Sequence, residues 1–149
     1  MEYAGERMKD LMRAHDEYIS SCQYIRMSDV YAAIVNMQSR RFWVSDTRAT
    51  KVVCAMLRGA PPKGMRPLKR EMFEEILRRV LALREERPGL AIMACCRIVV
   101  AQPAPKFYLA PGSAKVMVCK ARKQWAQEKA TRLRLPHLQS LPHLPHHEP

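Results

Sequence analysis

Apolar residues recur at three- and four-residue steps along most of the chain, which is the spacing of an amphipathic helix. Six stripes of this kind are present, at about residues 8–22, 30–37, 49–56, 67–87, 90–100 and 111–134. No stretch shows sustained two-residue alternation, which a half-buried strand would require. The pattern therefore predicts an all-α fold.

Capping residues and helix breakers set the expected ends of these helices. Ser28 and Ser45 precede the second and third stripes, where a serine hydroxyl can accept a hydrogen bond from a free backbone N–H. Gly59 is expected to end the third helix, and Pro67 suits the first turn of the fourth. Phe42-Trp43-Val44 lies between the second and third helices, and three bulky residues favour an extended turn packed by aromatic side chains.

A shift of 65 residues aligns Phe42-Trp43-Val44 with Phe107-Tyr108-Leu109 without a gap. Apolar positions on both sides coincide as well, for example Ile34-Val35 with Val99-Val100. Any two amphipathic helices can be slid into register, but the gapless aromatic turn argues against chance. The sequence therefore predicts two helix-turn-helix-like units, joined by the long fourth helix, at about residues 28–58 and 93–125.

Residues 1–134 are expected to form a single helical domain, followed by a low-complexity Pro/His tail at 135–149. In the tail, Leu135-Pro136-His137-Leu138 is echoed by Leu141-Pro142-His143-Leu144. Because the prolines oppose a helix that would align the histidine rings, a solvated tail is favoured over a metal-binding tract.

Charge is concentrated in the second half of each expected unit. The chain has 26 Lys and Arg against 14 Asp and Glu, a net charge of +12. Residues 38–70 alone carry nine basic and one acidic group, and residues 102–134 carry eight and one. A charge run is usually a solvated face, but an excess at equivalent places of a repeat points to a polyanionic partner.

Membrane, disulfide and zinc chemistry are not expected. The longest uncharged apolar run, Leu90 to Cys96, is far below the roughly 20 residues of a membrane span, and the N-terminus lacks the order of a signal peptide. We therefore expect a cytoplasmic protein without membrane association. The five cysteines are odd in number and lie in apolar helical patterns without a C-x-x-C motif, so they are interpreted as small core residues.

Signs of catalysis are few. The chain has no Gly-rich phosphate loop, no G-x-S-x-G and no H-E-x-x-H. Outside the tail the one histidine is His15, which falls on the apolar face of the first helix and is interpreted as a packed residue. Trp43 and Tyr108 are interpreted as core anchors rather than as bases for nucleobase stacking. We expect a non-enzyme without cofactor or metal.

The expected second helix of each unit carries basic and small polar residues off its apolar stripe, and basic residues precede it. Such residues suit phosphate contacts and the reading of base edges in a major groove. In the first unit these candidate nucleic-acid contacts are Arg40, Arg41, Thr47, Arg48, Thr50 and Lys51. In the second unit they are Lys106, Ser113, Lys115, Lys120, Arg122 and Lys123.

The aliphatic helix ending Ile34-Val35, the capping Ser45 and the Ala49-Val52-Val53 stripe resemble bacterial helix-turn-helix DNA-binding proteins of mobile elements and phages. The resemblance implies a recognition helix that docks in the major groove of double-stranded DNA. The segment from Gln38 to Val44 departs from the usual turn of three or four residues and would suit a hairpin-like arm instead.

Two alternatives remain open at this stage. The first is a protein-interaction or structural component of a phage or mobile element, whose basic faces meet an acidic protein. The second is RNA binding. The oligomeric state is not indicated by the sequence.

Overall fold

The computed structural model describes residues 3–140 and, within that range, the side chains of residues 3–134. This part of the chain contains six α-helices and no strand, so the predicted all-α fold is confirmed. The helices are α1 (Ala4–Ser21), α2 (Met27–Ile34), α3 (Asp46–Leu57), α4 (Pro67–Glu86), α5 (Ile92–Val100) and α6 (Pro111–Ser140).

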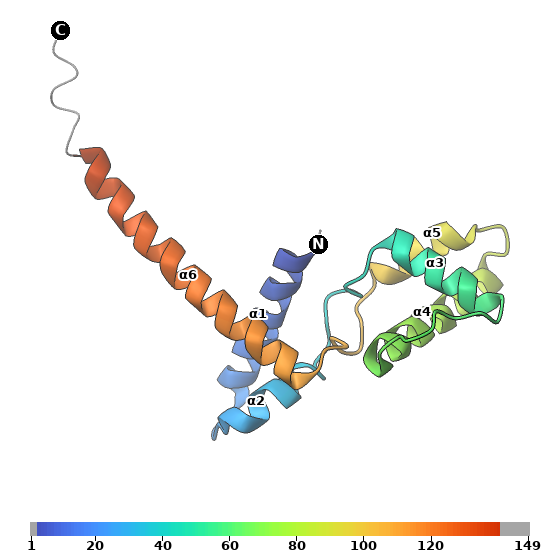
Figure 1. Ribbon diagram of the computed structural model, residues 1–149, viewed down its shortest axis with the longest axis horizontal. Helices are drawn as coiled ribbons and strands as arrows, with labels where there is room; N and C mark the ends of the chain where they lie inside the picture. Colours follow the sequence, from blue (N-terminus) through green and yellow to red (C-terminus); the bar gives the residue numbers. More distant parts are fainter. Residues whose placement is uncertain (1–2, 141–149) are drawn as a thin grey trace, which may run out of the picture.

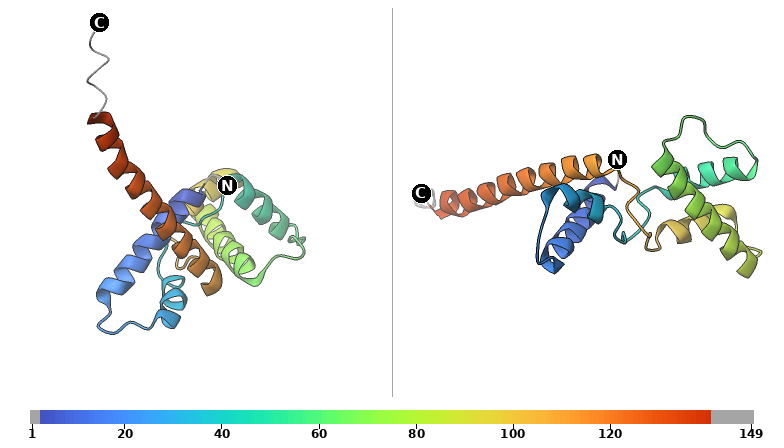
Figure 2. Two further views of the ribbon diagram at one scale, coloured as in Figure 1. Left: turned by 60° about the vertical axis from the view of Figure 1, so that its left-hand side comes forward. Right: turned by 90° about the horizontal axis from the view of Figure 1, so that it is seen from below.

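The helices form two lobes joined by two extended segments (Figures 1 and 2). In the first lobe, α1 packs against α2 and α6, and α2 also packs against α6. In the second lobe, α3, α4 and α5 pack against one another. The second lobe is therefore one continuous stretch of chain, whereas the first lobe takes its helices from both sides of that stretch.

Each lobe has its own hydrophobic core, formed by the apolar stripes of its three helices. The first core includes Leu11, Val30, Ile34, Ala114 and Val118, all fully buried. The second core includes Ala49, Val53, Ile76, Val80 and Val99, also fully buried. Burial of apolar surface at roughly 25 cal/mol per Å² is the main force that holds each set of three helices together.

The two segments that join the lobes, residues 35–45 and 101–110, cross and bond to each other. Ser39 and Ala104 exchange both backbone hydrogen bonds, each 2.9 Å from N to O, as an antiparallel pair. Phe42 N donates to Val100 O at 3.0 Å, and Phe107 N donates to Val35 O at 2.9 Å. The first segment is thus bonded to the end of α5 in the second lobe, and the second segment is bonded to the end of α2 in the first lobe.

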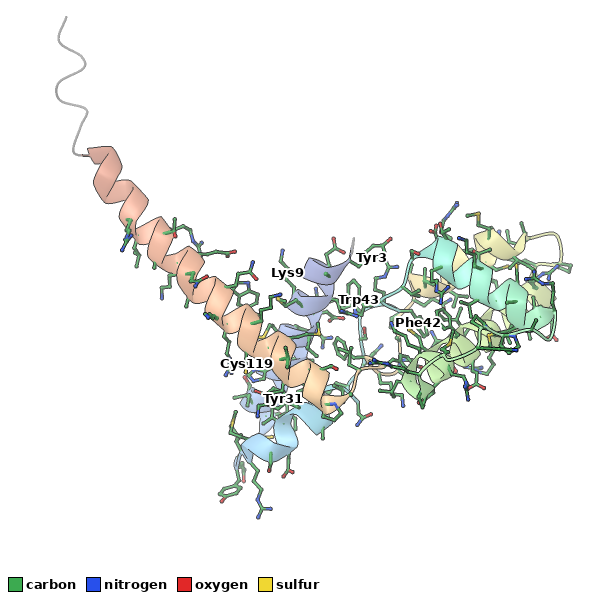
Figure 3. All side chains as sticks on the ribbon, viewed as in Figure 1. Tyr3, Lys9, Tyr31, Phe42, Trp43 and Cys119 are labelled. Atoms are coloured by element: carbon green, nitrogen blue, oxygen red, sulfur yellow. The ribbon has the colours of Figure 1, made fainter. Side chains whose placement is uncertain are left out.

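The aromatic residues of the two segments are core anchors, as predicted. Phe42 is fully buried in the second core and Phe107 is 4% exposed in the first core. The ring of Phe42 stacks on Tyr108, with centroids 6.1 Å apart. Trp43 lies beside α1 and joins the first core, so consecutive residues face different lobes (Figure 3).

Asp10 of α1 holds the first segment, residues 35–45, in place through hydrogen bonds. Its carboxylate is 1% exposed and accepts hydrogen bonds from Ser39 Oγ (3.2 Å), Arg40 N (2.8 Å) and Trp43 Nε1 (3.2 Å). Arg13 completes the group with an ion pair at 2.5 Å. A buried carboxylate needs such partners, because each unpaired buried charge costs several kcal/mol.

Three of the expected helix ends are confirmed and one is wrong. Gly59 follows the end of α3, after Leu57 and Arg58, in the left-handed region with φ 74°. Ser45 caps α3, its hydroxyl accepting from Arg48 N at 3.1 Å, and Pro67 stands in the first turn of α4. Ser28 does not cap α2, because the helix already begins at Met27, with Arg26 as the preceding residue. The backbone of Arg26 is extended, and α2 begins after it without a side-chain cap.

The expected packing of each unit's second helix on its own first helix is wrong. The first segment buries Phe42 in the second lobe, so α3 packs on α4 and α5 and not on α2. Correspondingly, α6 packs on α1 and α2. The local pattern gave the right helices, but the path of the connecting segments decides which of them meet.

Two further expectations, about Cys119 and about the end of the last helix, are wrong for α6. Cys119 is exposed on this helix, whereas Cys95 and Cys96 are buried core residues as expected and Cys22 and Cys54 are half-buried. The helix runs past its predicted end at residue 134 to Ser140, into the expected tail. The remainder of that tail, residues 141–149, lies outside the described residues.

Phe42→Ala should lower the free energy of unfolding by about 3–5 kcal/mol, because it removes a fully buried ring and leaves a cavity in the second core. Urea denaturation followed by circular dichroism measures this. Tyr24→Ala, at a side chain 81% exposed, should leave the midpoint unchanged. Equal midpoints for wild type and Phe42→Ala would contradict the anchoring role.

Asp10→Ala should destabilise the protein by about 3–5 kcal/mol, because it leaves Arg13 and the indole N–H of Trp43 without their buried acceptor. Asp16→Ala on the exposed side of the same helix should cost less than about 1 kcal/mol. Chemical denaturation of both variants gives the comparison. Similar losses for the two would show that the buried carboxylate does not hold the crossing.

Candidate nucleic-acid interface

Helix α3 presents part of the predicted contact set to solvent. Its apolar positions face the second core, and this orientation leaves Thr47, Arg48 and Lys51 exposed on the outer side. Thr50 is half-buried, and its hydroxyl donates back to Asp46 O at 2.7 Å. Three of the four predicted α3 residues are therefore accessible to a partner.

Helix α6 presents a longer basic surface. Ala114, Val118 and Ala121 face the first core. The predicted residues on the remaining sides are all exposed, namely Ser113, Lys115, Lys120, Arg122 and Lys123. Arg122 is held at the edge of the first lobe, with Nη2 3.1 Å from Nε2 of the buried His15.

Beyond Ala121, α6 leaves the first lobe and continues into solvent (Figure 1). Every residue from 122 to 134 is exposed. This part of the helix carries Arg122, Lys123, Lys129, Arg132 and Arg134 against the one acidic residue Glu128. Arg122 and Trp125 lie against α1, while the rest of the stretch offers mainly charged and polar side chains to solvent and is free to meet another molecule.

The predicted residues in the connecting segments have internal partners. Arg41 Nε and Nη2 donate to Phe42 O and Val44 O at 3.0 Å each, and its guanidinium lies 4.2 Å from the ring centroid of Tyr3. Lys106 forms an ion pair with Glu71. Arg40 lies 3.6 Å from Asp10 but keeps most of its side chain in solvent.

The basic residues of α3 and α6 differ from these in having no internal ion pair. Within residues 3–134, every ion pair joins an acidic side chain to a basic residue outside these two helices. On α3 this leaves Arg48 and Lys51 without an ion pair, and on α6 it leaves Lys115, Lys120, Arg122, Lys123, Lys129, Arg132 and Arg134. Because α3 and α6 belong to different lobes, these cations form two separate surfaces (Figure 1).

Sequence reasoning missed two cations close to Arg48. Lys69 of α4 is close enough for the charges of both Arg48 and Arg7 of α1 to act on it, although the three are far apart in the sequence. Desolvation lowers the pKa of Lys69, and the charges of Arg7 and Arg48 lower it further. Burial also lowers the pKa of Arg7, whose Nε is buried without a hydrogen-bond partner in the described part of the chain. No local pattern could have indicated this cluster, because it depends on how the lobes meet.

Residues considered for catalysis lie in the cores. His15 is 2% exposed, as expected for a packed histidine, with Nδ1 3.3 Å from Asp16. Burial raises the pKa of the Cys96 thiol, which disfavours the reactive thiolate. Trp43 and Tyr108 are 9% and 7% exposed, as expected for core anchors, and the exposed part of Trp43 lines a cavity.

Comparisons of the chain with protein-family models, with curated proteins and with solved structures give no match. The resemblance to helix-turn-helix proteins therefore remains a prediction. Among the described residues, no helix is both long and apolar enough to cross a bilayer.

Lys69→Gln should make the protein more stable at neutral pH, since it removes a cation that is partly desolvated and that Arg7 and Arg48 repel. The pKa of Lys69 is lower in the folded state than in the unfolded state, so the unfolded chain binds more protons between the two pKa values. The wild type should therefore gain stability as the pH rises towards about 10.5, and its difference from Lys69→Gln should shrink.

Thermal melts of both proteins at several pH values test this. Arg70→Gln, next to Lys69 on the exposed side of α4, is the matched control and should not show the same convergence. A Lys69→Gln variant that is less stable at every pH would contradict the repulsion.

Proposed function

We propose that this chain is a non-catalytic protein that binds double-stranded DNA through α3 and α6. The observation that carries the proposal is the set of exposed cations on these two helices that have no internal ion pair. Phosphates are the partners that such a surface attracts most strongly, because each contact releases condensed counterions. The neighbouring Thr47 and Ser113 add small polar groups suited to phosphate or base edges.

We further infer that the chain is a tandem repeat with exchanged third helices. Helices α2 and α5 begin 65 residues apart, and so do α3 and α6. The same shift relates the hydrogen bond from Phe42 N to Val100 O with that from Phe107 N to Val35 O. In this interpretation α1, α2 and α6 form one three-helix unit and α4, α5 and α3 form the other.

Such a unit has the composition of a three-helix DNA-binding module. Two helices support a third, and the third offers its outer side and its N-terminal turn to the groove. Arg48 and Lys115 lie close to the N-termini of α3 and α6, where a recognition helix makes most of its base contacts. The exchange leaves this arrangement intact, because a groove meets the helices of a unit regardless of how the chain connects them.

The projecting part of α6 extends the surface further. At 1.5 Å per residue, the exposed stretch from 122 to 134 is roughly 20 Å long. Its five cations would follow a phosphate backbone beyond the contacts made at the start of the helix.

One observation favours a second candidate, a protein partner on α6. Trp125 is 39% and Leu133 70% exposed on this projecting stretch. Exposed aromatic side chains are enriched at protein interfaces. An acidic helix lying along α6 would cover both residues and neutralise the same cations.

Gel retardation of a random-sequence duplex pool tests the DNA proposal. Lys51→Ala and the double variant Lys120→Ala/Lys123→Ala should weaken binding to every duplex. Each phosphate contact removed should flatten the slope of log K against log salt by about 0.9. Arg26→Ala and Arg87→Ala remove exposed cations outside α3 and α6 and should leave both affinity and slope as in the wild type.

Retardation should be strong near 50 mM salt, where non-specific electrostatic binding is favoured. A wild-type protein that leaves the whole pool unshifted there would rule out the DNA proposal. Equal losses for the control and test variants would show that overall charge, and not α3 and α6, carries the binding.

A further inference from the structure

A cavity of about 610 Å³ opens where the first connecting segment meets the start of α4. Its walls come from Tyr3, residues 43–45, Arg48 of α3, the loop residues 62–66, and Lys69 and Phe73 of α4. The volume lies within the range of about 300–1,000 Å³ typical of small-molecule sites. Tyr3 and Trp43, which line one side, lie at the junction between the lobes (Figure 3).

The cavity is strongly positive. Arg48, Lys63, Arg66 and Lys69 all line it, and none of its lining residues is Asp or Glu. Arg7, outside the lining, adds a fifth cation whose charge acts on Lys69. Gathering these charges without an acidic neighbour destabilises the empty site, so an anion of matching charge would bind with a gain from every one of them.

The aromatic and apolar part of the lining restricts which kinds of anion the cavity suits. The lining also includes the rings of Tyr3, Trp43 and Phe73 and the side chains of Val44 and Met65. Tyr3 and Trp43 have their centroids 6.3 Å apart in a tilted arrangement, and Arg41 lies against both rings. A wholly hydrated inorganic anion would gain nothing from such walls, whereas a planar ring would pack against the apolar surface that faces the cavity.

We propose that this cavity binds a nucleoside triphosphate. A phosphate monoester carries about −1.5 to −2 charges, so a single phosphate leaves most of the five cations unbalanced, while a triphosphate approaches balance. The base supplies the planar apolar part that the aromatic side of the cavity requires. The N-terminal ends of α3 and α4, at Ser45 and Arg66, border the same space and orient backbone dipoles favourably for phosphate.

The absence of carboxylates in the lining also bears on Mg²⁺. Protein sites for nucleotide-bound Mg²⁺ commonly supply one or two carboxylates. Here the side-chain cations take the place of the metal in balancing the phosphates, so binding should persist in EDTA.

Calorimetric titration with ATP in EDTA buffer is the direct test. ATP should bind more tightly than either tripolyphosphate or adenosine, because tripolyphosphate lacks the base and adenosine lacks the phosphates. Lys69→Gln and Arg66→Gln should each weaken ATP about tenfold or more, as expected for loss of a charge-assisted contact. Arg70→Gln, on the same helix but outside the lining, should bind ATP as the wild type does.

Fluorescence provides a second readout. In a Trp125→Phe background the remaining tryptophan is Trp43, which lines the cavity. ATP should change its emission, and tripolyphosphate should change it much less, since only the base reaches the aromatic side.

Three results would overturn the proposal: no ATP binding up to millimolar concentration, equal affinity for ATP and tripolyphosphate, or equal losses in Lys69→Gln and Arg70→Gln. The second of these would indicate a site for bare polyanions such as a DNA backbone. All titrations are made without DNA, and neither Lys69 nor Arg66 belongs to the proposed DNA contacts. Failure of nucleotide binding and failure of DNA binding are therefore separate outcomes.

Discussion

The crossing of the two connecting segments is the constraint on which the other features depend. Ser39 and Ala104 are both fully enclosed between the lobes, where an unpaired backbone group would cost about 1–3 kcal/mol. Their reciprocal hydrogen bonds, with those of Phe42 and Phe107, satisfy these groups and fix where each segment leaves its lobe. The partners of α3 and α6 follow from this geometry, since each helix begins where a crossing segment ends.

Asp10 links that crossing to the rest of the first lobe. The carboxylate holds Ser39, Arg40 and Trp43 at once, so the path of the segment is defined within a few ångströms. The same path brings Trp43 to one side of the basic cavity and starts α3 at Ser45. A single buried acid thus positions both the cation-rich helix and the wall of the cavity, although it lies outside both surfaces.

The features that sequence could predict are those that local pattern determines. Amphipathic spacing gave the helices, the serine hydroxyl at Ser45 gave a helix start, and bulky aromatic residues gave Phe42 and Phe107 as anchors. The packing of α3 on α4 and α5, and of α6 on α1 and α2, could not be predicted, because the same stripes would pack equally well on either neighbour. The cluster of Arg7, Arg48 and Lys69 depends in turn on that packing, so spacing along the chain carries no sign of it.

The division of the chain between the lobes also sets an order in time. During synthesis the second lobe can close once the segment through Tyr108 has emerged, since all of its helices are contiguous. Helices α1 and α2 emerge first, yet their apolar faces stay uncovered until α6 has been made as far as Ala121. At roughly 5–20 residues per second, that wait lasts several seconds. The first lobe, whose first two helices are made before the second lobe, is therefore completed after it, and during this interval its uncovered helices are exposed to chaperones and to aggregation.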